Sequence, residues 1–285
     1  MRSLFNRSLN GILRCINLIE RIINIVFTVI RAAIKRTSTE SVRIPNDPSG
    51  WEKMYLTKAR PVTEIKSEIV KHLLDLSRQG ESMLETGCGS GVLSAELALA
   101  GRNVALCDFS QPILDRAKEL FKVSGLGVPP TFLVDLTKPM PFSDQQFDIV
   151  WNSGVLEHWT DEELGPIIQE LARCARKCVI SLVPNERSVF YRYGRESAEM
   201  HGIAPWGREM PRSSLRFLFE EAGLIDVRET TVCVSDAPNL IALTDPVFLR
   251  KIKTWWDAVS DDDPVKEDQG YLLLTIGYKK IGGSK

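Results

Sequence analysis

The chain has 285 residues, of which 44% are hydrophobic and 26% charged, a composition typical of a globular protein with a substantial core. It argues against collagen, tandem repeats, a disulfide-stapled miniprotein and intrinsic disorder over most of the length. The six cysteines contain no CxxC pair, which favours a reducing, intracellular setting.

Charge is divided unevenly along the chain, although the formal net charge is -1. Residues 1–36 carry seven Arg or Lys and one Glu, a net charge of +6, and the remaining 29 basic and 36 acidic residues give -7. An acidic body does not attract polyphosphates in bulk, so nucleic acid is a poor candidate substrate.

Residues 1–36 have the pattern of an amphipathic helix, because polar residues recur every three or four positions beside a wide aliphatic face. Arg14, Glu20 and Arg21 interrupt the apolar stretch, which disfavours a membrane-spanning helix, and a secretory signal fits poorly. Two interpretations stay open: a helix in the interface of a membrane, or one docked on the body or on a partner subunit. Residues 37–60, which contain two prolines and a glycine, are interpreted as a linker.

Residues 61–285 alternate helical and strand patterns after a first helix predicted over 61–79. Strands are predicted at 82–86, 103–108, 131–135, 147–152, 178–183, 226–234 and 271–279, and helices at 92–100, 112–123, 162–176 and 213–222. The first five strands are nearly continuous hydrophobic runs, as in a parallel sheet covered by helices on both faces. The pattern predicts a doubly wound α/β fold.

A glycine-rich turn, Glu85-Thr86-Gly87-Cys88-Gly89-Ser90-Gly91, joins the first predicted strand to its helix. In a doubly wound sheet, such a turn lets a ligand approach the backbone at the carboxyl ends of the strands. Val92 stands where a P-loop would have lysine and where a dinucleotide loop would have its third glycine. An ATPase is therefore excluded, and a nicotinamide enzyme is the second choice.

This turn resembles the E/DxGxGxG motif of class I S-adenosylmethionine-dependent methyltransferases, and the likeness extends over residues 61–184. The second strand ends in Asp108, where these enzymes place a carboxylate that accepts hydrogen bonds from both ribose hydroxyls. The third ends in Asp135-Leu136, which looks like the family's adenine site. The resemblance implies S-adenosylmethionine as cofactor and a Rossmann-like, mostly parallel sheet with an antiparallel last strand.

The fourth strand continues into Asn152-Ser153-Gly154-Val155-Leu156-Glu157-His158, which is similar to the LEH stretch of small-molecule methyltransferases of the ubiquinone-biosynthesis type. It differs from the pattern of enzymes that methylate amino groups of adenine or glutamine. The cofactor-binding residues that we expect are Tyr55, Glu85, Gly87, Cys88, Gly89, Gly91, Asp108, Phe109, Asp135, Leu136 and Asn152.

The candidate catalytic residues are His158, Glu157 and His201. If the acceptor is a hydroxyl group, a base must take its proton, and histidine titrates near working pH. We favour His158 as that base, with Glu157 orienting it; a structural role for His158 near the next helix is the alternative. One Glu-His pair supplies too few ligands for a metal, and we expect none.

Residues 185–211 interrupt the fold with aromatic and arginine residues, which suits a lid over the acceptor and equally a packed surface subdomain. Trp51 and Tyr55, at the end of the linker, are expected to cover the cofactor from the other side. We therefore divide the chain into an amphipathic helix (1–36), a linker and cofactor-covering segment (37–60) and a methyltransferase domain (61–285).

The sequence thus predicts a cytoplasmic methyltransferase, associated with the inner face of a membrane if residues 1–36 bind lipid, that acts on oxygen of a small or lipid-linked acceptor. The alternatives are an NAD-dependent oxidoreductase and a non-catalytic cofactor-binding partner subunit. The acceptor, the pathway and the oligomeric state are not encoded in any motif.

Overall fold

The computed structural model describes residues 48–56, 60–201, 209–243 and 245–280, all within one compact unit. The expected amphipathic helix over residues 1–36 lies outside the described residues. None of the helices in the described ranges has the length and continuous apolar character that a bilayer crossing needs.

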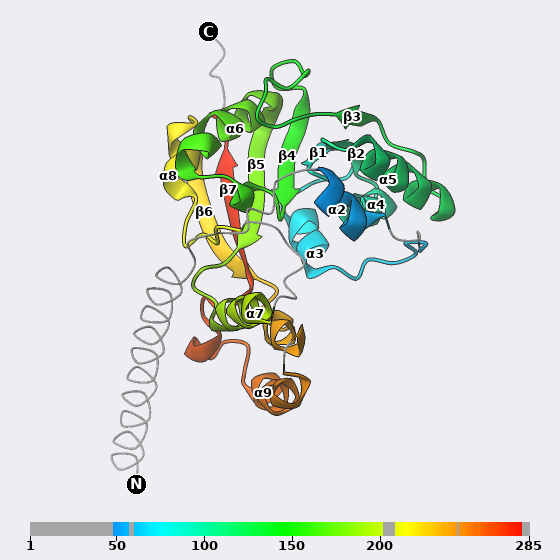
Figure 1. Cartoon of the computed structure of the whole chain (residues 1–285). Helices are drawn as coiled ribbons and strands as arrows, with labels where there is room; N and C mark the ends of the chain where they lie inside the picture. The colour runs from blue at the N-terminus through cyan, green and yellow to red at the C-terminus, as the bar shows by residue number, and fades with distance from the viewer. Residues whose placement is uncertain (1–47, 57–59, 202–208, 244, 281–285) are drawn as a thin grey trace. The chain divides into compact units, whose positions relative to one another are not determined.

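A seven-stranded sheet in the order β3-β2-β1-β4-β5-β7-β6 forms the centre of the molecule (Figure 1). Its strands are β1 (Ser82–Thr86), β2 (Asn103–Asp108), β3 (Thr131–Leu133), β4 (Phe147–Ser153), β5 (Ala175–Pro184), β6 (Ile225–Val232) and β7 (Leu272–Tyr278). The first five pair in parallel, and β7 is antiparallel to both β5 and β6. The predicted doubly wound, mostly parallel sheet with an antiparallel last strand is confirmed.

Helices cover both faces of the sheet. The helices are α2 (Pro48–Tyr55), α3 (Glu68–Asp75), α4 (Val92–Leu99), α5 (Gln111–Val123), α6 (Asp161–Cys174), α7 (Val189–Met200), α8 (Arg216–Glu221) and α9 (Pro246–Ala258), with 3-10 turns η1 (Leu156–His158), η2 (Ala237–Leu243) and η3 (Pro264–Lys266). Apolar side chains of α3, α4 and α5 pack in one core cluster, and those of α6 and α8 pack in the other. The sheet separates these two clusters.

Alternate residues of the central strands supply the two clusters, as the two-residue period of a strand requires. In β1, Met83 belongs to one cluster and its neighbour Leu84 to the other, and both are fully buried. Burying a side chain of this kind contributes roughly 1.5–3 kcal/mol relative to leaving it exposed. The strands are therefore fixed in register, and their carboxyl ends meet along one edge.

The helix predicted over 61–79 is shorter in the structure, because α3 begins only at Glu68. The backbone N–H groups of Lys66 and Ser67 donate to the side-chain carboxylate of Glu96, at 3.1 and 3.0 Å, instead of entering a helical turn. A buried acceptor on α4 thus replaces the first turn of the predicted helix.

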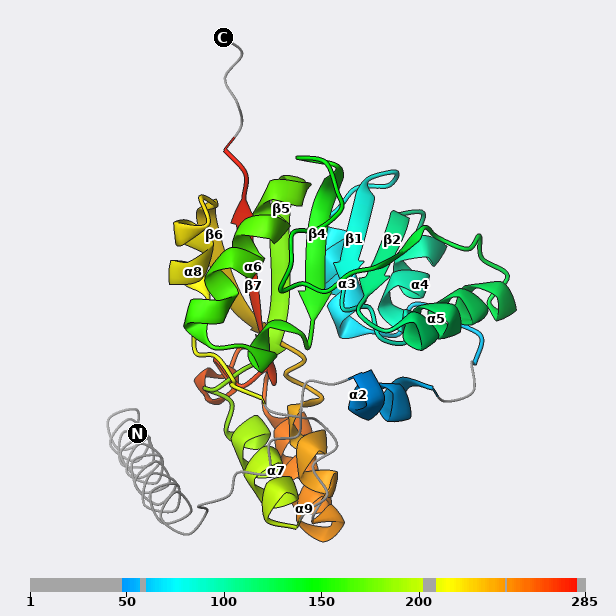
Figure 2. The same ribbon diagram turned by 45° about the horizontal axis from the view of Figure 1, so that its top comes forward.

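Three helices lie where the sequence predicted none. Helix α2 occupies the end of the expected linker, and α7 lies within the expected insertion 185–211. Figure 2 shows α7 and α9 beyond the carboxyl ends of the parallel strands, where both contact η2. The ring of Phe190 in α7 packs against Trp256 in α9, with centroids 4.8 Å apart. The described part of the insertion therefore belongs to a packed helical layer.

Candidate active site

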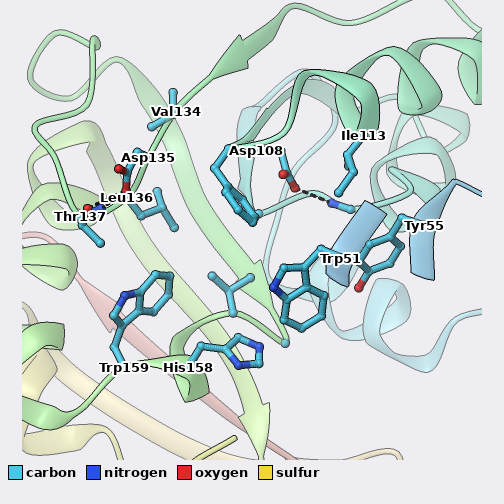
Figure 3. A pocket seen from close by; sticks show the side chains of 15 residues that line it. Trp51, Tyr55, Asp108, Ile113, Val134, Asp135, Leu136, Thr137, His158 and Trp159 are labelled. Atoms are coloured by element: carbon cyan, nitrogen blue, oxygen red, sulfur yellow. Dashed lines mark hydrogen bonds between the residues drawn. The ribbon is translucent and has the colours of Figure 1, made fainter. Parts of the chain in front are cut away.

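A cavity of about 300 Å³ lies at the carboxyl ends of the parallel strands (Figure 3). Helix α2 and the loops after β1, β2, β3 and β4 each contribute to its wall. The lining residues are Trp51, Tyr55, Gly87, Gly89, Asp108, Phe109, Ile113, Val134, Asp135, Leu136, Thr137, Gly154, Val155, His158 and Trp159. This size is in the range of pockets that hold small molecules and cofactors.

The glycine-rich turn after β1 forms one side of the cavity with bare backbone. Gly87 and Gly89 have φ angles of +66° and +51°, a left-handed conformation that other residues adopt only with strain. A Cβ at Gly87 would lie 2.7 Å from Cγ2 of Val155, and one at Gly89 would lie 2.9 Å from the ring of Tyr55. Gly91 does not line the cavity; a Cβ there would lie 3.0 Å from Cβ of Ala117 in α5.

Asp108, the last residue of β2, presents a buried carboxylate to the same cavity. Its Oδ2 accepts a hydrogen bond from the backbone N–H of Gly89, at 3.1 Å, and its Oδ1 accepts one from the backbone N–H of Ser110, also at 3.1 Å. Burial raises the pKa of Asp108, and the three backbone donors around it oppose that rise. The carboxylate is thus held in place at the mouth of the glycine-rich turn.

Glu85 lies behind the turn and does not line the cavity. Its Oε2 accepts a hydrogen bond of 2.5 Å from Oγ of Ser94 in α4. Burial, together with the nearby charge of Asp108, raises the pKa of Glu85 to about 8. Cys88, the next predicted residue, is also buried away from the cavity, and its N–H donates to the carbonyl of Cys107 at 3.0 Å.

The loop after β3 forms the opposite wall. The Oδ1 atom of Asp135 accepts hydrogen bonds from N–H and Oγ1 of Thr137, at 3.0 and 2.6 Å, and Oδ2 pairs with Lys138 at 3.1 Å. These interactions, the Thr137 hydroxyl foremost, lower the pKa of Asp135. The carboxylate is therefore ionised at neutral pH. Val134 and Leu136 on either side add apolar surface to the lining.

His158 comes into the cavity from the loop after β4. It is buried and lies at the end of η1, with its ring edge-on to Trp51 at a centroid distance of 4.9 Å. Figure 3 shows its imidazole facing Trp51 across the cavity. Its Nε2 is 3.9 Å from Oε1 of Glu157.

Glu157 does not line the cavity but lies directly behind His158. Its carboxyl group is buried, and Oε2 has no hydrogen-bond partner among the described residues. Burial raises the pKa of Glu157 well above the usual range.

Two further predicted site residues lie outside the cavity wall. Asn152 is buried within β4 and accepts a hydrogen bond from Oγ of Ser181 at 2.7 Å. His201 is exposed at the end of α7, and its Nδ1 is 2.7 Å from the carbonyl of Ser197. No described residue of the insertion 185–211 lines the cavity.

Several lining residues escaped sequence analysis. Trp159 lines the cavity and directly follows His158 in the sequence. Its position beside the predicted motif is the signal that could have identified it. Ile113 reaches the cavity from the first turn of α5, and Val155 reaches it from the loop after β4. Both look like ordinary core residues in the sequence, so only the folded chain identifies them.

Comparison with known proteins agrees with this geometry. The methyltransferase domain family matches residues 83–177. An uncharacterised methyltransferase of Schizosaccharomyces pombe is 33% identical over 229 residues, which is 73% of this chain and 85% of the relative. The chain belongs to the class I S-adenosylmethionine-dependent methyltransferases. This membership confirms a methyltransferase with S-adenosylmethionine as its cofactor, in place of the oxidoreductase alternative.

Two further proteins show the likeness at lower identity. A probable tocopherol O-methyltransferase of Oryza sativa is 30% identical over 225 residues, and this chain spans 56% of that relative's length. The crystal structure of magnesium protoporphyrin IX methyltransferase from Synechocystis, with bound SAH, superimposes with a TM-score of 0.51 at 17% identity, over 81% of this chain and 94% of that one. That likeness shows the fold alone.

Proposed function

We propose that this methyltransferase transfers a methyl group to an oxygen atom of a small apolar acceptor, with His158 as the base. The observation that carries the proposal is that a buried histidine shares one cavity with Asp108 and with the bare backbone of Gly87 and Gly89. A proton acceptor and a nucleoside-sized cradle therefore face each other within one small site.

The residues around the glycine-rich turn fit the cofactor. Asp108 would accept hydrogen bonds from the ribose hydroxyls, since a carboxylate with two oxygens matches a diol. Gly87 and Gly89 present bare backbone to the cavity, and the missing Cβ atoms let Val155 and the ring of Tyr55 approach that backbone closely. Asp135 and Leu136 would hold the adenine ring, with Phe109 as an apolar neighbour. S-adenosylmethionine supplies an electrophilic methyl group on a positively charged sulfur.

The predicted residues that lie behind the cavity would act indirectly. Glu85 and Cys88 support the turn from below, Gly91 allows α4 to pack on α5, and Asn152 holds the end of β4. Tyr55 covers the turn, with its ring against Gly89. We therefore assign direct cofactor contact to the residues that line the cavity, Tyr55 included. The supporting role falls to the four residues behind the cavity: Glu85, Cys88, Gly91 and Asn152.

His158 would take the proton of the acceptor hydroxyl as the carbon–oxygen bond forms. General base catalysis of this kind contributes roughly 10²–10⁴-fold to the rate. Glu157 lies 3.9 Å from Nε2 and would act as a positioning residue for the imidazole. Trp51 restricts the ring from the other side. Alignment of the acceptor oxygen with the methyl group supplies the rest of the rate enhancement.

The wall around His158 favours an uncharged, apolar acceptor. It consists of Trp51, Val155 and Trp159, and the described residues that line the cavity include no Lys or Arg. Apart from the sulfonium of the cofactor, a phosphate or carboxylate on the acceptor would find two carboxylates and no cationic side chain in this lining. The name of the rice relative, an O-methyltransferase, also supports oxygen as the methylated atom.

The test is to incubate the protein with methyl-labelled cofactor and with separate lipid, small-metabolite and protein fractions of the source cell. We expect label in a lipid or small-metabolite product as a methyl ether or ester. With that acceptor, His158→Asn should lower kcat by about 10²–10⁴-fold and leave the affinity for SAH unchanged. Labelled protein, labelled amine, or an unchanged kcat in the variant would each overturn the proposal.

A further inference from the structure

Helix α2 touches three different parts of the cavity with residues of a single turn. Trp51 meets the ring of His158, and Tyr55 lies against the backbone of Gly89. Between them, Glu52 reaches the loop that follows Asp108. The helix therefore spans the cavity from the proposed base to the proposed cofactor cradle, as Figure 3 shows for its two aromatic residues.

The contact of Glu52 is a hydrogen bond to a buried serine. Oγ of Ser110 donates to Oε1 of Glu52 at 2.7 Å, and Ser110 is only 3% exposed. The same oxygen accepts a hydrogen bond from the N–H of Ile113 at 3.4 Å and thereby caps the first turn of α5. The cap uses Ser110 only as an acceptor, so the hydroxyl hydrogen remains available to Glu52.

Ser110 also connects this contact to the site itself. Its backbone N–H donates to Oδ1 of Asp108, and the residue that it caps, Ile113, lines the cavity. One serine thus fixes the carboxylate proposed for the ribose, fixes an apolar lining residue, and holds α2. An ordinary N-cap would account for the contact with Ile113. It would not account for the contacts with Asp108 and Glu52.

We propose that Glu52 is a positioning residue for methyl transfer, which holds α2 across the cavity through Ser110. The inference rests on the proposed function, because it assumes that the cofactor lies between Asp108 and the glycine-rich turn. With the hydrogen bond in place, Tyr55 closes the cavity above Gly89 and Trp51 restricts the imidazole of His158. Without it, α2 keeps its aromatic contacts but loses its polar attachment to the nucleoside side of the site.

The loss should appear first in the release of the bound nucleoside, since Tyr55 of α2 covers the glycine-rich turn at which that ligand is proposed to lie. We expect Glu52→Ala to release bound SAH about tenfold faster, the size of effect expected when a hydrogen bond to a charged group is removed. The Michaelis constant for the cofactor should rise by a similar factor. The fall in kcat should be smaller, because His158 and the acceptor wall are unchanged.

The experiment measures release of labelled SAH into excess unlabelled SAH for the full chain and three variants. Glu52→Gln keeps an oxygen that can accept from Ser110 and should remain within about twofold of the wild-type rate. Glu119→Ala removes an exposed glutamate from α5, has no contact with the cavity, and should behave as wild type. Thermal unfolding of each variant shows that the chains are folded.

The outcomes separate this inference from the proposed function. Wild-type release by Glu52→Ala would overturn the role of Glu52, and so would equal acceleration by Glu52→Gln and Glu52→Ala. Asp108→Ala provides the reference for the site: if this variant binds SAH as tightly as wild type, the proposed placement of the cofactor fails. A weakened Asp108→Ala with an unaffected Glu52→Ala leaves the proposed function standing and rejects only the positioning role.

Discussion

Two buried carboxyl groups on neighbouring strands dominate the electrostatics of the site at the scale of single residues. Glu85 lies near the end of β1, next to the glycine-rich turn. Asp108 is the last residue of β2 and contacts the same turn. Burial raises the pKa of both groups, and the charge of Asp108 raises that of Glu85 further. The site without cofactor is therefore short of positive charge, which suits a ligand that carries a sulfonium group.

We expect Glu85→Gln to change how stability depends on pH. In the unfolded chain Glu85 loses its proton near 4.5, but in the folded chain only near 8, so the folded chain binds more protons between these values. The contribution of this carboxyl group to the free energy of unfolding is therefore complete below pH 4.5 and is lost as the pH rises through 8. Its slope is at most about 1.4 kcal/mol per pH unit.

Urea unfolding without cofactor at pH 5, 6, 7 and 8 measures this effect. Glu85→Gln should gain stability relative to wild type as the pH increases, and Glu119→Gln, on the exposed side of α5, should follow wild type. Parallel pH profiles for Glu85→Gln and wild type would contradict the raised pKa.

Sequence analysis predicted part of the site at this scale, because some residues carry their chemistry in the pattern. Gly87, Gly89, Asp108, Asp135 and His158 are polar or bare positions at strand ends, and all five line the cavity. Their roles toward cofactor and acceptor stay predictions. Glu85 and Glu157 belong to the same patterns but lie behind the wall, because the local backbone conformation at the end of β1 and in η1 decides which way each side chain faces.

At the scale of elements, the strands were predictable and several helices were not. Each core strand is an apolar run long enough to identify itself, and β2 has the bounds predicted for it. Helices α2, α7 and α9 are short, aromatic or highly charged, and their apolar faces pack on one another or on loops. A single sequence window does not contain the partners that stabilise them.

Helix α3 gives a testable case of such a tertiary partner. Glu96 in α4 accepts the N–H groups of Lys66 and Ser67, so Glu96→Ala should lower the free energy of unfolding by about 2 kcal/mol. Glu96→Gln keeps one acceptor oxygen and should lose less. Urea unfolding measures the loss, and hydrogen exchange should show faster exchange at the amides of residues 66 and 67. Unchanged exchange at these amides would show that they do not depend on Glu96.

At the scale of the whole molecule, charge is segregated between a basic first segment and an acidic remainder. The sequence of residues 1–36, with its +6 charge and aliphatic face, supports our proposal that this segment binds the surface of an anionic membrane. Such binding would bring the methyltransferase to the membrane in which lipid-linked acceptors lie.

Sedimentation with anionic liposomes tests this proposal. The full chain should sediment with vesicles that contain phosphatidylserine, and less so at high salt, whereas a chain lacking residues 1–36 should stay in the supernatant. Neutral vesicles serve as the control. Equal behaviour of the two chains, whether both sediment or neither does, would favour the alternative in which the segment docks on protein.

The antiparallel strand β7 has a consequence for how the molecule is made. It is the sole partner of β6 in the described sheet, and it supplies Leu273 to one core cluster and Leu274 to the other. Until residue 278 has been added to a growing chain, β6 therefore has no strand to pair with, and β5 is the open edge of the sheet. Completion of the hydrophobic layers must wait for this last strand, so the β6–β7 half of the sheet can form only after the strands that carry the cavity have been synthesised.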